Sequence, residues 1–351
     1  MSKRKLTRHQ TWRAEKIQQE RAKRAEKKQR NLRSQQQSGD LSCEQKGLVV
    51  CRYSTHYEVE ALEGDDQGKI HQCVARTNLN AIVAGDYVIW RAGSGLSGVI
   101  ESRVKRASLL ERPDNFGKLK AVAANINQML IVIACEPAPQ PNLIDRYLVA
   151  AELTGIDPII VLNKADLLDE YNTELIQSTL DIYRALEYPV VQIISSRHQT
   201  PQLNELTAHI DQQTSIVVGQ SGVGKSSLIN TLLPEAQLRI GELSELTREG
   251  THTTSMAKLF HLPNGGQLID SPGIRDFSLW HINQQQLQQG FRELAALAGH
   301  CRFRDCQHVS EPGCAILSAA ETGLIDPERF ESYERIKLAI EQQQARGLCL
   351  D

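Results

Sequence analysis

The segment that decides the fold is Gly219-Gln220-Ser221-Gly222-Val223-Gly224-Lys225-Ser226. It fits the phosphate-loop pattern G-x-x-x-x-G-K-[ST] at every fixed position. The β-branched run at 215–218 predicts a buried strand before it, and residues 226–232, including Ser227, predict the first turns of a helix after it. Because backbone N–H groups and the helix dipole both favour negative charge there, the segment predicts a nucleotide phosphate site. Lys225 is expected to reach the β- and γ-phosphates, and the Ser226 hydroxyl to bind Mg²⁺.

A second motif, Asn163-Lys164-Ala165-Asp166, directly follows the apolar run 158–162 and so lies at the carboxyl end of a predicted strand. The Asp166 carboxylate can accept hydrogen bonds from guanine N1–H and N2–H together. Adenine lacks this donor pair, and a site built around such a pair rejects the analogue by roughly 10⁴ or more. Asn163 is expected to contact the base edge and to brace neighbouring loops, while the Lys164 stem lies against the base plane.

Two serines are candidates for a second loop on the base side. Ser195 and Ser196 follow the predicted strand 190–194. The alternative is an ordinary polar turn.

The third motif is Asp270-Ser271-Pro272-Gly273. Asp270 is expected to hold Mg²⁺ through a water molecule, and the Gly273 N–H to meet the γ-phosphate. Such contacts order a switch segment with triphosphate and release it after hydrolysis. Small GTPases place a water-orienting Gln directly after this Gly, but here the position is Ile274, so another group has to orient the water.

A polar segment at residues 249–255 lies between the phosphate loop and Asp270, where the first switch of a GTPase belongs. Either Thr253 or Thr254 is expected to supply a second hydroxyl to Mg²⁺. His252 is the candidate for positioning the attacking water. A plain surface-loop position is the alternative for His252.

A group of metal-ligand side chains comes later, in the pattern C-x4-C-x-H-x5-C formed by Cys301, Cys306, His308 and Cys314. Three thiolates and an imidazole at short spacing suit tetrahedral Zn²⁺, and four protein ligands leave no open position, so one structural zinc is predicted. The chain has eight cysteines and no apparent secretory leader, which favours a reducing compartment and metal over disulfide. Coincidental clustering and a redox pair are the alternatives.

The net charge of −2 hides an asymmetry along the chain. Residues 1–33 carry thirteen Lys and Arg against three Asp and Glu, and the remainder carries 27 against 39. This basic stretch has almost no apolar content, which predicts a leader that is disordered or transiently helical in isolation and that folds on RNA. A solvated tail and a transit peptide are alternatives, although interspersed acids oppose the latter. No apolar run approaches eighteen residues, so no membrane span is expected.

The chain of 351 residues is long enough for two or three folded domains. Alternating segments from residue 47 to 104 predict five short strands in a barrel of the OB type, which either binds nucleic acid or is purely structural. Residues 125–275 alternate apolar strands with helical stretches, which predicts a mostly parallel sheet with helices on both faces. We therefore divide the chain into a leader (1–40), a barrel (41–108), a GTPase domain (109–278) and a helical zinc-knuckle domain (279–351). In the last domain, helices are predicted over 283–297 and 327–345, and the second has the pattern of an amphipathic helix that binds a partner.

The order of the motifs is itself informative. An ordinary GTPase runs phosphate loop, Asp-x-x-Gly, then Asn-Lys-x-Asp, whereas here the base-reading motif comes first. All three parts are present, so the multi-domain α/β chain is predicted to contain a circularly permuted G domain.

Together with the metal spacing, these motifs resemble the RsgA (YjeQ) family of ribosome small-subunit-dependent GTPases over nearly the whole chain. The resemblance implies a bacterial cytoplasmic GTPase that docks on the small (30S) ribosomal subunit and its 16S rRNA. It implies slow turnover of GTP to GDP and phosphate, stimulated by the subunit, during late maturation and release of assembly factors. It further implies Mg²⁺ with GTP, a role for His252 in hydrolysis, and a hydrophobic residue at position 274. We expect a monomer.

Two other functions are compatible with parts of the pattern. A metabolic ATPase or kinase would use the phosphate loop, but Asn163 and Asp166 oppose it. An RNA-binding assembly scaffold with a regulatory, slowly turning-over nucleotide site is the second alternative. The intact set of Lys225, Ser226 and Asp270 opposes this scaffold.

Overall fold

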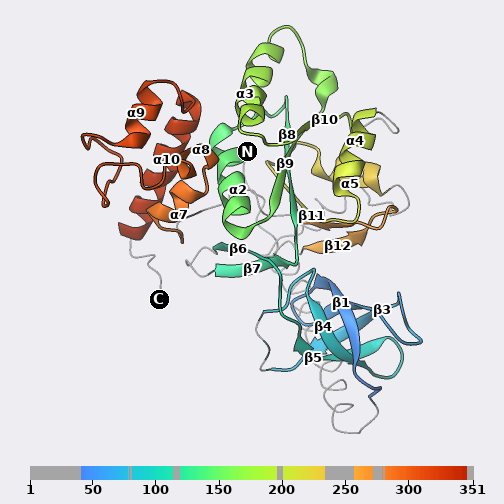
Figure 1. Cartoon of the computed structure of the whole chain (residues 1–351). Helices are drawn as coiled ribbons and strands as arrows, with labels where there is room; N and C mark the ends of the chain where they lie inside the picture. Colours follow the sequence, from blue (N-terminus) through green and yellow to red (C-terminus); the bar gives the residue numbers. More distant parts are fainter. Residues whose placement is uncertain are drawn as a thin grey trace, which may run out of the picture. The chain divides into compact units, whose positions relative to one another are not determined.

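The computed structural model describes residues 41–77, 79, 81–113, 119–195, 201–233, 257–271, 279 and 281–345. The chain divides into two compact units, one of residues up to 82 with 86–105, and one of residues 83–85 with everything from 106 onward. The predicted leader, residues 1–40, lies outside the described residues. Figure 1 shows the elements of both units.

The first unit is a closed five-stranded barrel. Its strands are β1 (Gln45–Arg52), β2 (Tyr57–Ala61), β3 (Ile70–Ala75), β4 (Tyr87–Ala92) and β5 (Ser97–Arg103). β1 pairs with both β2 and β4, β2 pairs with β3, β4 pairs with β5, and the parallel pair β3–β5 closes the ring. Closure leaves no open sheet edge. The five predicted strands and the OB-type barrel are confirmed.

Trp90 fills the centre of this barrel and is fully buried. Two glycines make room for its ring. A Cβ added at Gly47 would lie 2.6 Å from Trp90 Cδ1, and one added at Gly98 would lie 2.7 Å from Trp90 Cε3. Side chains cannot occupy these positions unless the indole moves, so the large aromatic and the two glycines form one packing unit.

The second unit contains a six-stranded sheet in the order β10 (Val190–Gln192), β9 (Asp157–Asn163), β8 (Gln128–Ala134), β11 (Thr214–Val218), β13 (Gln267–Asp270) and β12 (Lys258–His261). All neighbouring pairs are parallel except β12–β13. Every residue of β8 is buried, as expected of a central strand covered on both faces.

Helices cover both faces of this sheet, as predicted (Figure 1). On one face, α4 (Pro201–Ile210) and α5 (Lys225–Leu232) contribute Leu203, Leu206, Leu228 and Ile229 to a buried cluster with strand residues such as Val132 and Val217. The other face carries α2 (Pro141–Thr154), with α3 (Thr173–Ala185) beside β10. Among the described helices, none combines the length and apolar character needed to cross a bilayer.

A hairpin that the sequence analysis did not anticipate precedes this sheet. β6 (Leu109–Pro113) and β7 (Leu119–Ala124) pair antiparallel as a separate two-stranded sheet. Ala123 forms a bridge with Ala84, and Asn125 Nδ2 donates to the Gly85 carbonyl at 2.7 Å. The hairpin is thereby joined to the short segment 83–85 of the same unit.

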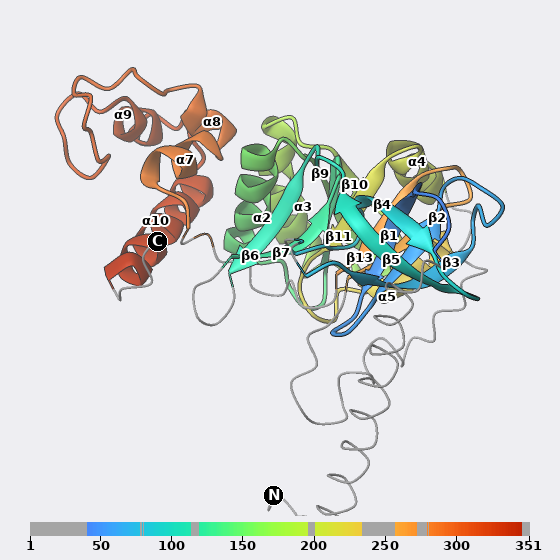
Figure 2. The ribbon, with the colours of Figure 1, turned by 90° about the horizontal axis from the view of Figure 1, so that it is seen from below.

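The C-terminal part of the unit is helical. It contains α7 (Gln284–Gln289), α8 (Arg292–Ala295), α9 (Ala315–Glu321) and α10 (Pro327–Ala345), and Figure 2 shows the three shorter helices beside the long α10. The sequence predicted one helix over 283–297, but the chain breaks it at Gly290. A Cβ at Gly290 would lie 2.6 Å from Val149 Cγ1 of α2, so close helix approach there requires glycine.

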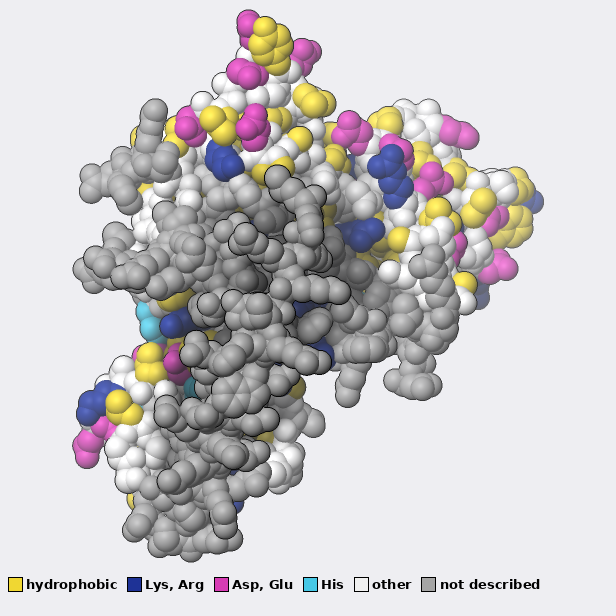
Figure 3. All heavy atoms as spheres, turned by 180° about the vertical axis from the view of Figure 1, so that it is seen from behind, with side chains coloured by type: hydrophobic (Ala, Val, Ile, Leu, Met, Phe, Trp, Pro, Cys, Tyr) yellow, Lys and Arg dark blue, Asp and Glu magenta, His cyan; other side chains and the backbone are white. Residues whose placement is uncertain are grey.

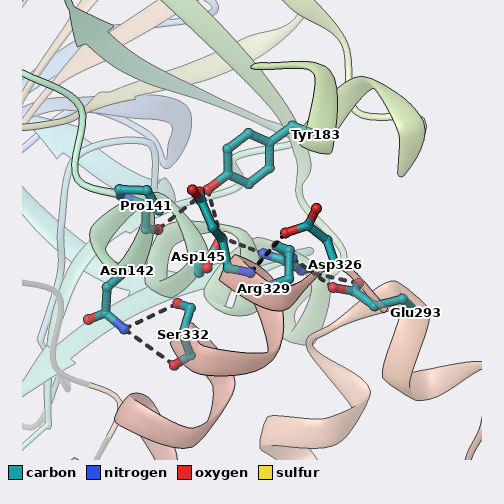
Figure 4. Close-up of polar contacts among 9 residues, drawn as sticks. Pro141, Asn142, Asp145, Tyr183, Glu293, Asp326, Arg329 and Ser332 are labelled. Carbon is teal, nitrogen blue, oxygen red and sulfur yellow. Dashed lines mark hydrogen bonds and ion pairs between the residues drawn. The ribbon is translucent and has the colours of Figure 1, made fainter. Parts of the chain in front are cut away.

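A buried ion-pair network joins these helices to α2 and α3 (Figure 4). Arg329 of α10 is 2 % exposed and donates to Asp145 of α2 and, at 2.7 Å, to Glu293 of α8. Tyr183 of α3 donates to Asp145 at 2.9 Å. The sequence suggested that α10 would bind a partner as an amphipathic helix, but its buried face packs against α2 of the same chain.

Candidate functional site

The phosphate loop lies between β11 and α5, as its flanking sequence predicted. Gly219, Gly222 and Gly224 all have left-handed φ values, of 140°, 86° and 91°. Gly219 packs on the neighbouring strand, where a Cβ would lie 2.1 Å from the Val132 carbonyl oxygen. The loop therefore needs glycine both for its backbone angles and for its contact with β8.

Lys225 begins α5 and folds back over the loop. Its Nζ donates to the carbonyl oxygens of Gly219 and Gln220. The ammonium group thus lies at the mouth of the loop, where phosphate oxygens would offer a charged acceptor in place of two neutral carbonyls. Ser226 and Ser227 follow in the first turn of α5, and both are half-buried.

Asn163, at the end of β9, joins the base motif to the phosphate loop. It is fully buried, its Nδ2 donates to the Val223 carbonyl at 2.9 Å, and its Oδ1 accepts from the Ser195 backbone N–H at 3.1 Å. A Cβ at Gly224 would lie 2.3 Å from this amide nitrogen. One side chain therefore fixes the spacing of the phosphate loop, the base motif and the loop after β10.

The remaining residues of the base motif, 164–166, follow the Asn163 brace, by which we mean the Asn163 side chain and its hydrogen bonds to Val223 and Ser195. Lys164 adopts a left-handed conformation with φ 58°, and its Nζ donates to the Glu136 carbonyl at 2.7 Å. The Ala165 N–H donates to the Ile193 carbonyl at 3.1 Å, which holds the short 3₁₀ helix η1 (Ala165–Leu167) against the strand end. Asp166 lies in η1 and is exposed.

Asp270 ends β13 at the same edge of the sheet. It pairs in register with Val217, two residues before the phosphate loop, and is 4 % exposed. Burial raises the pKa of Asp270 to about 6, against the opposing effect of the nearby Lys225 charge. A buried carboxylate beside one cation is a site that a divalent metal would further stabilise.

The carboxyl ends of β9, β11 and β13 thus gather Asn163, Gly219 and Asp270, although up to 107 residues separate them in the chain. Parallel strands bring such ends to one edge, which is where open α/β sheets bind ligands. Several residues singled out from sequence lie outside the described residues, namely Ser196, His252, Thr253, Thr254, Gly273 and Ile274.

Sequence reasoning missed two partners of the site. The first is the Glu136 carbonyl, which accepts a hydrogen bond from Lys164 Nζ. The second is Pro137, whose Cδ would lie 3.6 Å from a Cβ added at Gly222. Both belong to the loop between β8 and α2. No local motif marks this loop. However, it follows a buried strand of the same parallel sheet, and loops at the carboxyl ends of such strands commonly line the ligand site, so its position could have indicated it.

The four metal-ligand candidates form a second cluster in the helical part. Their ligand atoms all lie within 4.8 Å of one another. Cys301 Sγ lies 3.9 Å from Cys314 Sγ, and His308 Nδ1 lies 3.3 Å from Cys314 Sγ. Tetrahedral Zn–S bonds of about 2.3 Å require sulfur atoms about 3.8 Å apart, so the cluster has the size that zinc needs. Burial lowers the pKa of His308, which favours the neutral imidazole of a metal ligand.

Comparisons with known proteins bear on both clusters. A family model described as RsgA GTPase matches residues 103–280. The chain is 53 % identical over 343 residues to the small ribosomal subunit biogenesis GTPase RsgA of Hahella chejuensis, covering 98 % of each protein. It is 51 % identical over 350 residues to the protein of the same name from Marinobacter nauticus, covering all of both.

Solved structures with the same fold are also known. The crystal structure of YjeQ from Thermotoga maritima superposes with a TM-score of 0.68 and 30 % identity, over 85 % of this chain and 99 % of that one. YloQ, described as a circularly permuted GTPase, superposes with a TM-score of 0.66 and 28 % identity, over 86 % of this chain and 96 % of that one. The permuted order of the motifs is therefore shared with experimentally solved proteins.

Proposed function

The chain belongs to the RsgA GTPase family, and on this premise we propose that it hydrolyses GTP to GDP and phosphate in the biogenesis of the small ribosomal subunit. The observation that carries the proposal is the Asn163 brace. Its hydrogen bonds to Val223 and Ser195 hold residues 163–166 close to the phosphate loop at one sheet edge, which supports a site that binds both base and phosphates.

Within this site each residue has a distinct task. The phosphate loop, Gly219 to Ser226, cradles the phosphates with its backbone N–H groups, and Lys225 exchanges its carbonyl partners for β- and γ-phosphate oxygens. Asp166 reads the guanine N1–H and N2–H, and Lys164 lies along the base. Ser226 and Asp270 would hold Mg²⁺, with Thr253 or Thr254 as a further hydroxyl ligand, and the ion would screen the phosphate charge.

The hydrolytic step needs a group that orients water, and the family's hydrophobic residue at 274 does not supply one. We assign this positioning to His252. The test compares GTP turnover by the intact protein and by His252→Ala, with and without purified small subunits. The expected result is intact GTP binding but loss of subunit-stimulated turnover, by about 10²-fold or more. Unchanged stimulation would remove His252 from the mechanism.

The GTPase function itself is tested by the same assay on the unsubstituted chain. Slow turnover alone and faster turnover with small subunits are expected. ATP should fail to displace bound GDP at concentrations where GTP displaces it, because adenine leaves the Asp166 carboxylate without donors. Displacement by ATP as effective as by GTP would favour a metabolic ATPase. Undetectable turnover in the presence of subunits would favour an RNA-binding scaffold.

The Cys301, Cys306, His308 and Cys314 cluster is proposed to hold one structural zinc ion. Cys314 also accepts from the Leu317 N–H at 3.4 Å at the start of α9, so the metal ligand and the helix cap are one residue. Metal analysis of the purified chain should give one zinc per protein. Chelation should unfold the short helices around the cluster while guanine nucleotide still binds. Retained helical content in the metal-free protein would contradict a structural role.

Partners follow from the family and from charge. We propose that the chain works in the cytoplasm as a monomer. The barrel, within residues 41–108, and the zinc-knuckle domain, 279–351, would contact 16S rRNA, with the basic leader, 1–40, adding electrostatic attraction. Hydrolysis then removes the γ-phosphate contacts of residues 245–255 and 270–276, the chain leaves the subunit, and late assembly factors are released.

A further inference from the structure

An exposed apolar cluster lies immediately after the guanine-reading motif. Tyr171 is 86 % exposed, Leu175 is 66 % exposed and Leu167 is 43 % exposed. Tyr171 is the most exposed large hydrophobic side chain among the residues that the structure describes. Large apolar side chains grouped on a surface mark interaction sites, whereas single ones do not. We call residues 167–175, between η1 and α3, the α3 tip.

The backbone of the α3 tip, from the end of η1 to the first turn of α3, is held by side-chain hydrogen bonds. Asp169 Oδ1 accepts from the backbone N–H groups of Tyr171 and Asn172, at 3.0 and 2.9 Å. Asn172 Nδ2 donates to the Leu167 carbonyl at 3.1 Å. These bonds order the backbone at Tyr171, whose side chain projects into solvent. A tyrosine side chain has only two rotatable torsions, so ordering it on binding costs little entropy, which helps to make aromatic residues effective binding anchors.

The charge of the tip selects among partners. Residues 167–175 contain Asp169, Glu170 and Glu174 and no Lys or Arg, and all three carboxylate side chains are exposed. In Figure 3, acidic and hydrophobic side chains lie together at the end of the molecule where Figure 1 places α3. Nucleic acid offers phosphates, which this charge repels. A protein segment rich in Lys and Arg has the complementary charge.

We propose that the α3 tip docks a Lys- and Arg-rich protein segment of the small ribosomal subunit that carries an apolar residue for the Tyr171 and Leu175 surface. This inference rests on the proposed function, since the subunit supplies the partner. Tyr171 and Leu175 form the apolar anchor, and Glu170 and Glu174 form the charged rim. Because the tip begins one residue after Asp166, the docked segment lies next to the guanine site.

The first test measures binding of the full chain, loaded with a non-hydrolysable GTP analogue, to purified small subunits. The double variant Tyr171→Ala/Leu175→Ala should bind on the order of tenfold more weakly. The double charge reversal Glu170→Lys/Glu174→Lys should also weaken binding, more at low salt than at high salt. The matched control Glu205→Lys reverses an exposed charge on α4 and should bind as the unsubstituted chain does.

The second test replaces Tyr171 by a photoreactive phenylalanine analogue and identifies what is crosslinked in the purified subunits. A crosslink to a Lys- and Arg-rich stretch of a ribosomal protein is expected. A crosslink to rRNA, or no crosslink, would overturn the proposal, as would full affinity of both double variants. In these cases the GTPase function stands, because the unsubstituted chain still binds subunits. Failure of the unsubstituted chain to bind subunits would instead overturn both proposals.

Basal GTP turnover and guanine nucleotide affinity should be unchanged in Tyr171→Ala/Leu175→Ala, which excludes misfolding as the cause of weaker subunit binding.

Discussion

Asp270 is the proposed Mg²⁺ ligand, and its charge state would connect folding with nucleotide binding. Its carboxyl is buried at the strand end, which raises its pKa from 3.8 to about 6. The folded chain therefore binds a proton that the unfolded chain has released between these pH values. Because of this, the free energy of unfolding of the nucleotide-free protein should fall, by about 3 kcal/mol at most, as the pH rises from 4 through 6.

The opposite pH dependence is expected for Mg²⁺-dependent nucleotide binding, because a metal needs the carboxylate. Affinity for GDP with Mg²⁺ should drop roughly threefold to fivefold between pH 7.5 and 5.5. Asp270→Asn should remove most of this pH dependence in calorimetric titrations, while the ionisation of the nucleotide phosphates stays common to both proteins. A pH profile identical in Asp270→Asn would show that another group is responsible.

Gly224 is a second residue whose chemistry can be isolated. An added methyl group would lie 2.3 Å from the Asn163 amide nitrogen, and the backbone there has a φ of 91°. Gly224→Ala should therefore displace Asn163 and weaken GDP binding by tenfold or more. Gly155→Ala is the matched control, since it shares a left-handed φ of 67° but has open space around the added methyl group. Equal affinity of both variants would contradict the brace.

Among the helices and strands, those whose own residue pattern specifies them were predicted from the sequence. Alternation predicted the five barrel strands, and apolar runs followed by polar motifs predicted β9, β11 and β13. The helix over 327–345 was also predicted with its observed limits. Each of these elements has a hydrophobic periodicity or a boundary residue that can be recognised without knowing what the element contacts elsewhere in the chain.

Other elements depend on distant contacts and were missed or wrong. Gly290, between α7 and α8, packs closely against Val149 of α2, a contact that no neighbouring residue signals. The β6–β7 hairpin is joined to the segment 83–85 by a β-bridge. The buried face of α10 packs against α2 of the same chain, and not against a partner as predicted.

For the candidate site, the sequence predicted that Asn163 braces neighbouring loops, and its hydrogen bonds to Val223 and Ser195 do so. The contacts of the loop after β8, from the Glu136 carbonyl and Pro137, were not predicted.

Across the whole molecule, the buried ion pairs of Arg329 link the helical C-terminal part to α2 of the G domain. Arg329→Met would leave Asp145 and Glu293 buried without their cation, which typically costs 3–5 kcal/mol. Limited proteolysis should then release the C-terminal helices while nucleotide binding persists. Arg335→Met is the control on the same helix. It removes an exposed pair with Glu331 and should change stability by less than about 0.5 kcal/mol. Equal resistance of both variants to proteolysis would show that the network does not hold these helices.

The same network bears on how nucleotide state reaches the rest of the chain. The permutation makes the segment after Asp270 run directly into the helical part, and we propose that this segment passes on switch movement. Arg329 adds a second connection through α2, whose preceding loop meets Lys164 and the phosphate loop. If the helical part keeps one placement in GTP-analogue and GDP crystals and on the subunit, the proposed transmission is wrong.

The proposed function depends on one pocket that binds guanine and triphosphate together and is assembled from a circularly permuted chain. The most direct measurement is the affinity of Asp166→Asn for GDP and for xanthosine diphosphate, with Lys225 intact. Xanthine carries an oxygen where guanine carries its amino group, so an amide at position 166 can donate to it. We expect GDP affinity to fall by about 10²-fold or more and xanthosine diphosphate to bind more tightly than GDP. Unchanged preference for GDP would show that Asp166 does not read the base, and the single pocket would be contradicted.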